Sequence, residues 1–218
     1  VTLEIPYEEY DRLIAKDGLA GSCNNVSDIG MIFFNDIDVM LDRNVRQAAV
    51  MAVDKKLLVD RLLRGYGQTT KGFKPKDYEM VQAIVGMWRK VGIEASIEVY
   101  EIAKHYELRA ADKLAPAAFY NWGNAIGDPT TSTGFATYGP SPHSVWDSQD
   151  LIDMINPLWG EKDETKRVAG WKAVDKYIAE QAYVLPLIQY AQPIVHAKGV
   201  NVVQHVSGAL LPALMTPA

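Results

Sequence analysis

The sequence predicts an α/β fold, and three observations support this. Segments with apolar residues at helical spacing alternate with short apolar or strictly alternating segments typical of strands. The chain has 218 residues, 48% hydrophobic and 22% charged, which suits one large globular domain or two small ones. No internal repeat or low-complexity tract interrupts the alternation. We therefore expect strands and helices that pack as layers around a core.

The first elements are a strand, a helix and a second strand. Val1–Ile5 alternates and predicts a strand, and Pro6 opens a short helix that Gly18 would end. Gly30–Phe34 is a short apolar run, which is typical of a buried strand.

Three aspartates then predict the starts of three helices. Asp42 is a suitable N-cap for a helix beginning at Arg43, and Asp54 for a segment over Lys55–Leu63. Asp77 can cap the third helix, which Gly92 ends.

The middle of the chain predicts strand, helix, strand and a long irregular segment. Ile93–Tyr100 alternates as a half-buried strand does, Ala103–Lys113 is helical in pattern, and Ala117–Trp122 predicts another strand. Gly123–Trp146 has no period of 2 or 3.6. Long ordered segments without regular structure are usually functional, so we expect a role for this one.

The last third predicts two helices and two strands. Ser148–Ile155 is a short helix, and Asp163 caps a longer one. Val184–Tyr190 and Ile194–Ala197 are expected as separate strands around Pro193. We expect three tryptophans on apolar helical faces to be core residues: Trp88, Trp159 and Trp171.

Charge and composition exclude several kinds of partner and site. The net charge of -5 argues against nucleic acid and against an anionic membrane surface. The single cysteine, Cys23, has no partner within the chain for a disulfide or a zinc site. The four histidines are isolated in sequence, so no metal site is expected, and no hydrolase or phosphate-loop motif occurs. We expect no cofactor and no catalytic residue.

The ends of the sequence indicate a piece of a longer protein. No apolar run is long enough to span a membrane, and Val1–Pro6 is neither a signal peptide nor an initiator segment.

A set of motifs in a fixed order carries a family resemblance. Leu41–Gly65 and Tyr120–Pro129 are its main parts, supported by Phe34-Asn35, Val91–Glu94 and Leu185–Leu187. Together they resemble the family 5 (peptide- and nickel-type, cluster C) extracellular solute-binding proteins of bacterial ABC importers. The resemblance implies a periplasmic-binding-protein-like lobe with a mixed sheet flanked by helices, here a fragment holding the C-terminal lobe.

The resemblance also implies domain limits, function and location. Residues 1–192 would be the second lobe, and residues 193–218 a segment that returns toward a missing N-terminal lobe. The protein would capture a small, peptide-like or related solute and deliver it to a membrane permease, without chemistry. It would be periplasmic, or lipid-anchored outside the cell. The alternatives are a lobe that only binds other proteins, and a hydrolase using Asp128 and Glu101.

Three candidate ligand-binding residues lie around the irregular segment. The resemblance places Trp122 in the wall of the ligand cleft; a core position is the alternative. Asn124 offers two donors and an acceptor, for a ligand or for the loop backbone. Asp128 precedes Pro129, and its carboxylate is expected either to cap the next turn or to face the cleft.

Two further candidates lie earlier in the chain. Arg46 offers a guanidinium for an acidic ligand group, or for a buried pair with Asp42 or Asp54. Asn35 ends its strand, where it holds a turn or contacts the cleft.

The sequence departs from the family pattern at two places that matter for the ligand and the chain. Peptide binders of this family carry an aspartate for the peptide ammonium where this chain has Ala125. We therefore expect a solute other than a peptide held by its free N-terminus. The family also has several dozen residues where only Gln68, Thr69 and Thr70 stand here, so the Gln68–Lys71 junction is not expected to be a native tight connection.

Overall fold

The computed structural model describes residues 1–2, 5–63, 66, 75–111, 113–124, 126–142, 144 and 146–218. The expectations about Ala125 and about the Gln68–Lys71 junction concern residues outside these ranges, and both stay predictions.

A three-stranded antiparallel sheet organises the chain and confirms the α/β class. Its order is β2-β1-β3, with β1 at Leu19–Phe34, β2 at Ala117–Gly123 and β3 at Val184–Ala197. β1 pairs with β2 from Asp28↔Gly123 to Phe34↔Ala117, and with β3 along nearly its whole length.

The expected strand lengths were wrong at β1 and β3. β1 begins eleven residues before Gly30, and β3 continues through Pro193 instead of breaking into two strands. Pro193 is tolerated because β3 lies at the edge of the sheet, where a missing backbone N–H need not break a ladder. Pairing of β1 with β3 compensates for the weak strand pattern of residues 19–28.

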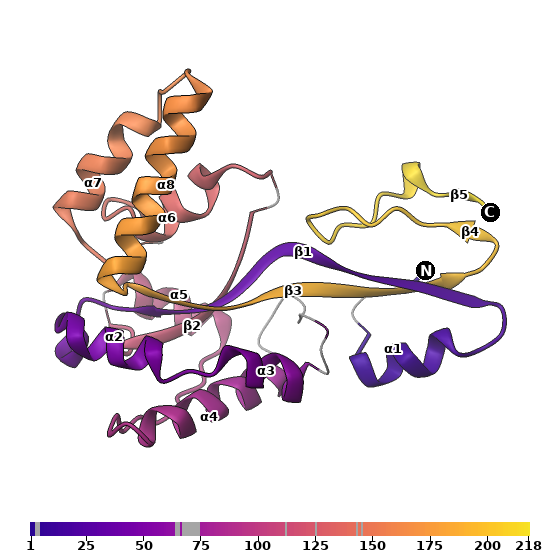
Figure 1. The fold of residues 1–218 in the computed structure, drawn as a ribbon, viewed down its shortest axis with the longest axis horizontal. Helices are drawn as coiled ribbons and strands as arrows, with labels where there is room; N and C mark the ends of the chain where they lie inside the picture. The colour runs from indigo at the N-terminus through magenta and orange to yellow at the C-terminus, as the bar shows by residue number, and fades with distance from the viewer. Residues whose placement is uncertain are drawn as a thin grey trace.

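The long β1–β3 ribbon joins two parts of the molecule (Figure 1). One part holds β2 and the helices α2 to α8. We call the other part the arm: residues 1–2, 5–25 and 191–218, with α1 (Tyr7–Ile14), β4 (Val200–Asn201) and β5 (Thr216–Pro217). Both chain ends lie in the arm (Figure 1). A bridge between Thr2 and Val195 and a small core of Ile5, Tyr10 and Val195 hold it together.

The expected domain boundary after residue 192 falls inside β3. The strand runs through it, and α1 packs with the segment that follows. The boundary itself stays a prediction; the N-terminal helix and the C-terminal tail form one packed unit.

Helices α2 (Arg43–Met51), α3 (Lys55–Leu62) and α4 (Pro75–Arg89) pack on one face of the sheet around the main core. The caps expected at Asp42 and Asp54 are confirmed, since their carboxylates accept hydrogen bonds from Asn44 N and Leu57 N at 2.8 and 2.9 Å. The cap expected at Asp77 is wrong. α4 begins at Pro75, a residue favoured in the first turn, and Asp77 lies inside the helix with no exposed surface.

The remaining helices are α5 (Ile102–Ala110), α6 (Thr133–Thr137), α7 (Gln149–Ile155) and α8 (Glu164–Gln181). α7 and α8 enclose a second core around Leu151, Ile155 and Val174. Ala182 ends α8 in the left-handed region, at φ 52°, and the chain turns from there into β3. Four 3₁₀ turns complete the described elements: η1 (Asp38–Leu41), η2 (Pro129–Thr131), η3 (Asn156–Leu158) and η4 (Pro212–Leu214).

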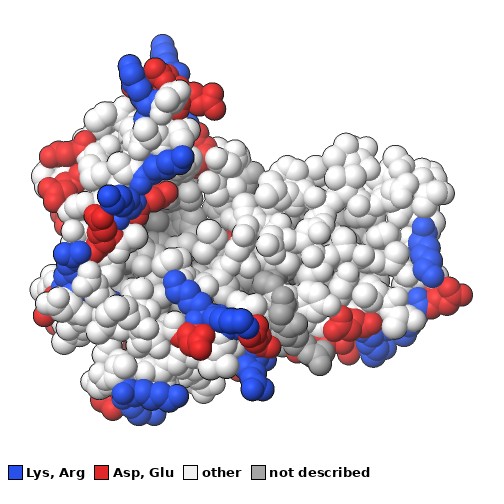
Figure 2. All heavy atoms as spheres, viewed as in Figure 1, with Lys and Arg blue, Asp and Glu red and all other residues white. Residues whose placement is uncertain are grey.

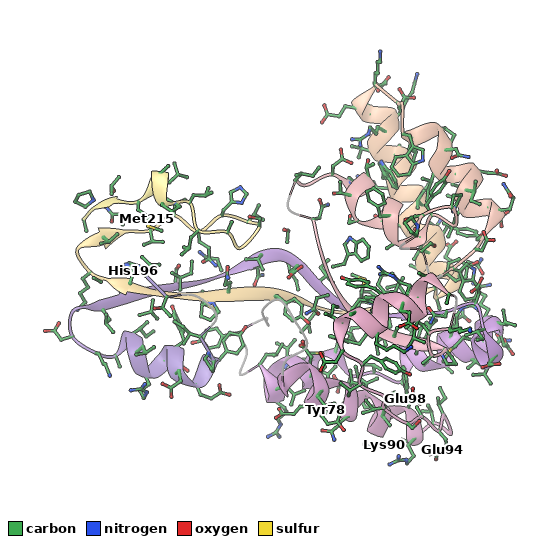
Figure 3. All side chains as sticks on the ribbon, turned by 180° about the vertical axis from the view of Figure 1, so that it is seen from behind. Tyr78, Lys90, Glu94, Glu98, His196 and Met215 are labelled. Atoms are coloured by element: carbon green, nitrogen blue, oxygen red, sulfur yellow. The ribbon has the colours of Figure 1, made fainter. Side chains whose placement is uncertain are left out.

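Two more expectations were wrong. Ile93–Tyr100 has no ladder partner within the described ranges; its apolar side packs on the main core, but no neighbouring strand supplies hydrogen bonds. Glu94 and Glu98 of this segment lie at the opposite end of the molecule from His196 and Met215 of the arm (Figure 3). Trp159 is 41% exposed, whereas Trp88 and Trp171 are buried as expected. Trp159 stands just after η3, outside the apolar face of α8.

Candidate functional site

Trp122 is the centre of the candidate site. It lies near the end of β2, opposite Ile29 of β1, and is half-buried. Its indole Nε1 donates to the carbonyl of Thr131 at 3.2 Å, and its ring lies 6.4 Å from that of Phe33. The loop that follows β2 therefore folds back onto the indole and fixes its orientation.

Asn124 holds the frame of that loop. Its backbone N–H donates to the carbonyl of Ser27 at 3.0 Å, and its own carbonyl accepts from Gly127 N at 3.2 Å. The Oδ1 atom accepts weakly from the Thr131 hydroxyl at 3.5 Å. Asn124 is half-buried, and solute contact by its side chain stays a prediction.

Asp128 caps the short turn η2 and forms an ion pair with α8. Its carboxylate accepts from Thr130 N at 2.9 Å and from Nη2 of Arg167, which lies 2.6 Å from each carboxylate oxygen. Hydrogen bonds from Thr130 and Arg167 lower the pKa of Asp128 to about 2. The carboxyl group is therefore ionised at neutral pH.

Asn35 lies away from this group. It follows the end of β1, six residues after Ile29, which is about 20 Å along an extended strand. Its Nδ2 donates to the Ala115 carbonyl and its backbone N–H to Pro116 O at 2.9 Å. Asn35 therefore holds the turn that leads into β2, which is one of the two roles expected for it.

Arg46 is also separate from the loop, and the ion pair expected for it is wrong. The side chain is only 2% exposed. Its guanidinium donates to the carbonyls of Met40, Leu41 and Gln181 at 2.6, 3.1 and 3.0 Å. Asp42 and Asp54 instead use their carboxylates as helix caps.

Two aromatic rings enclose the guanidinium of Arg46. It lies 4.4 Å from the centre of the Trp146 ring and 5.0 Å from that of Tyr183. Burial lowers the pKa of Arg46. Arg46 thus joins the ends of η1 and α8, and in this structure its guanidinium is hydrogen-bonded to backbone carbonyls of the protein.

Sequence reasoning missed a cluster on the α5 side of the sheet. His105 and Arg109 lie one turn apart on α5 and face Tyr120 of β2, two residues before Trp122. The available signal was the i, i+4 spacing of a histidine and an arginine on a helix that adjoins the Trp122 strand.

Other chemistry has little support among the described residues. No three His, Cys, Asp or Glu side chains in those ranges could hold a metal ion. Cys23 is half-buried, and burial raises the pKa of its thiol to about 11, so the thiol is protonated at neutral pH. None of the helices described is long and apolar enough to cross a membrane.

The C-terminal tail of the arm, Gly199–Ala218, carries no charged side chain. Charged side chains gather over the helices, while the surface over β4 and β5 is almost free of them (Figure 2). In the sequence, Lys198 is the one charged residue between Ala182 and Ala218. Three apolar side chains are exposed on the uncharged tail, residues 199–218: Val203 at 48%, Val206 at 53% and Leu214 at 48%.

Comparisons with known proteins place this fold. No protein-family model matches the chain. One curated relative, the dipeptide-binding protein of Escherichia coli, is 29% identical over 118 residues, 52% of this chain and 22% of that protein.

The structural matches cover the whole chain but half of each relative. The ABC transporter substrate binding protein CtaP from Listeria monocytogenes matches 100% of the chain and 56% of its own length, with 12% identity and a TM-score of 0.81. NikA from Brucella suis, in complex with Fe(III)-EDTA, matches 98% and 56%, with 17% identity and a TM-score of 0.80. The dipeptide binding protein from Pseudoalteromonas, in complex with Met-Leu, matches 97% and 52%, with 15% identity and a TM-score of 0.78. The chain thus has the fold of about one half of the peptide- and nickel-type solute-binding proteins.

Proposed function

We propose that the chain is part of the solute-binding component of an ABC importer, which captures a small solute and performs no chemistry on it. The observation that carries this is the fold match, which spans at least 97% of the chain in each solute-binding protein compared. Trp122 and the loop held by Asn124 and Asp128 supply a flat apolar wall beside polar groups, which is the usual composition of a small-molecule site.

The helical part would be the second lobe, and residues 193–218 the return toward the other one. The uncharged tail with exposed Val203, Val206 and Leu214 supports a covered surface there. β1 and β3 would connect the lobes, since they alone run through both parts of the described structure. Closure of two lobes about such a connection would bury the solute.

The permease, and a location outside the cytoplasmic membrane, belong to the same proposal. They rest on relatives described as a periplasmic murein tripeptide binding protein and as an ABC transporter substrate binding protein. The solute would be peptide-like or related, but not anchored by a free peptide ammonium, because Ala125 replaces the acidic residue of the family pattern.

Direct identification of the solute tests the binding role. The natural full-length protein would be purified without refolding, and the solute released by denaturation identified by mass spectrometry. We expect one dominant small molecule, which rebinds to the dialysed protein in calorimetric titration. Absence of any retained or rebinding solute would count against the function.

A tryptophan substitution tests the site. Trp122→Ala should weaken rebinding by about tenfold or more, since an aromatic wall contributes on the order of 1–3 kcal/mol. Trp159→Ala is the matched control, because Trp159 is exposed and packs on Phe135 and Tyr138 rather than on the loop beside Trp122. Equal affinities in both variants would refute this placement of the site. Loss of uptake of the labelled solute in cells lacking the protein would test the transport step.

A further inference from the structure

The indole of Trp122 is hydrogen-bonded to a carbonyl that belongs to no strand. Its Nε1 donates to Thr131 O at 3.2 Å, and Thr131 is the last residue of the 3₁₀ turn η2. A turn of three residues does not keep its place by its own hydrogen bonds, because short helical segments are marginal in water. The position of this carbonyl therefore depends on the contacts that hold η2.

Helix α8 holds the residues of η2 that precede Thr131. Nη2 of Arg167, in the first turn of α8, lies 2.6 Å from each carboxylate oxygen of Asp128 and 2.8 Å from the hydroxyl of Thr130. Asp128 in turn caps η2 by accepting from Thr130 N at 2.9 Å. Hydrogen bonds from the side chains of Thr130 and Arg167 lower the pKa of Asp128 to about 2, so this charged contact is present at neutral pH.

The same helix holds the chain again just after Thr131. The hydroxyl of Thr133 donates to Oδ1 of Asp175 at 3.2 Å, about two turns further along α8. Gly134 packs so closely on the helix that an added Cβ would lie 3.0 Å from the ring of Trp171. The Thr131 carbonyl thus lies between two attachments to one helix of 18 residues, which packs on its own core.

A helix with its own core is a firmer support for a binding residue than a loop. The side chain of Arg167 is 30% exposed, and its Nη2 already has three acceptors in the loop. These contacts favour a role in which Arg167 acts through the loop and not by direct contact with a solute.

We propose that Arg167 is a positioning residue of the solute site. Through Asp128 and Thr130 it sets the place of the Thr131 carbonyl. The carbonyl in turn sets the orientation of the Trp122 indole on which the solute packs. This inference rests on the proposed function and adds to it the residue of α8 that keeps the aromatic wall ready for binding.

Fluorine NMR of the solute-free protein tests the positioning step. The natural full-length protein is labelled with 5-fluorotryptophan, and the Trp122 resonance is assigned as the one that Trp122→Phe removes. Arg167→Gln should shift or broaden this resonance by more than its linewidth, because η2 loses its charged contact with α8. An unchanged Trp122 resonance would overturn the inference.

Two further variants separate the contact from its charge. Lys166→Gln removes the same charge from the adjacent residue, whose Nζ lies 3.8 Å from Asp163 and whose side chain is 72% exposed. It should leave the Trp122 resonance unchanged, and a shift as large as that of Arg167→Gln would count against positioning. Thr130→Val removes a hydroxyl that contacts Arg167 without changing the charge, and it should cause a smaller shift. If Arg167→Gln does not fold, Thr130→Val decides.

A double-mutant cycle tests the consequence for binding. The solute that co-purifies with the natural protein is titrated calorimetrically into the dialysed protein and its variants. Arg167→Gln should weaken binding about threefold to tenfold, and by no more than Trp122→Ala does. In the Trp122→Ala background it should cause no further loss, because the side chain that it positions is gone. Additive losses would mean that Arg167 acts on the solute without Trp122, which overturns the inference.

The two proposals can fail separately. If no solute co-purifies or rebinds, the solute-binding function fails, while the fluorine resonance still decides whether Arg167 positions Trp122. If binding depends on Trp122 but is unchanged in Arg167→Gln, the positioning role fails and the solute-binding function stands.

Discussion

Nη2 of Arg167 on α8 lies 2.6 Å from both carboxylate oxygens of Asp128, and 2.8 Å from the hydroxyl of Thr130. One guanidinium thus ties the loop after β2 to a helix that begins more than thirty residues later. Both side chains are 30% exposed, so solvent screens part of the interaction. The contact nevertheless fixes where the loop beside Trp122 lies.

Replacing the carboxylate of Asp128 should lower the free energy of unfolding only slightly. The loss should appear only at pH values where the carboxylate is ionised. Asp128→Asn keeps an N-cap but removes the charge, so we expect a loss of about 0.5–1 kcal/mol in urea unfolding at pH 7. The folded pKa, about 2, lies below that of an unfolded aspartate, so the contribution is present above the unfolded value. It is lost as the pH falls through the folded value. The control is Asp54→Asn, a cap without a described ion pair; a larger loss in the control would contradict the assignment.

Arg46 should be far more sensitive than its neighbour Arg43. Lysine at position 46 cannot bind three carbonyls in a fork or lie flat between two rings. We expect Arg46→Lys to reduce the free energy of unfolding by about 2–3 kcal/mol. Arg43→Lys, at an exposed site where the side chain donates to Glu180 O, should cost less than about 1 kcal/mol. Similar losses in the two variants would show that the ring stacking and the three carbonyl hydrogen bonds of Arg46 add nothing to the free energy of unfolding.

Gly30 should not tolerate a methyl group, whereas Gly86 should. A Cβ at Gly30 would clash with the hydroxyl oxygen of Tyr190, which is fully buried and donates to Asn121 at 2.6 Å. We expect Gly30→Ala to destabilise by about 1–3 kcal/mol in chemical denaturation. Gly86→Ala, inside α4 with nothing within 4 Å, should stabilise by up to about 1 kcal/mol.

A second substitution checks that the clash is the cause. Tyr190→Phe removes the nearest of the three atoms that a Cβ at Gly30 would meet. In the Gly30→Ala background it should therefore cost less than it does alone. Additive losses would point to another origin of the Gly30 effect.

Hydrogen exchange tests the backbone hydrogen bonds of Ser27, which connect the arm to the loop beside Trp122. Ser27 N donates to Val206 O at 2.7 Å, and Ser27 O accepts from Asn124 N at 3.0 Å, at an irregularity in the β1–β3 pairing. The amides of Ser27 and Asn124 should exchange much more slowly than that of Ile126, which is 72% exposed. Ser27→Pro removes the donor, and the tail around Val206 should then exchange faster. Unchanged exchange in the tail would mean that this bond does not hold it.

The sequence predicted the helices and the shorter strand well because their signals are local. Asp42, Asp54 and Asp163 cap the helices expected of them, since capping depends on residues only two or three positions away. The strand expected at Ala117–Trp122 is there for the same reason: its three aromatic residues favour a strand, and Pro116 and Gly123 bound it. The family resemblance also led to the correct fold.

The long strands and the site required distant contacts. Residues 19–28 have little strand pattern, and only pairing with β3, more than 160 residues away, makes them part of β1. Asp128 was expected to cap a turn or to face the cleft, and the contact that occupies it comes from Arg167, which no spacing rule connects to it.

By itself, the sequence determined the α/β class, most helix starts, the uncharged tail and the place of Trp122 at the end of a strand. Tertiary structure alone decided that Arg46 lies between Trp146 and Tyr183, and that the rings of His105 and Tyr120 meet beside Arg109. The reason is physical: caps and periodicity act over a few residues, whereas burial, ring stacking and polar satisfaction depend on which distant segments the sheet brings into contact.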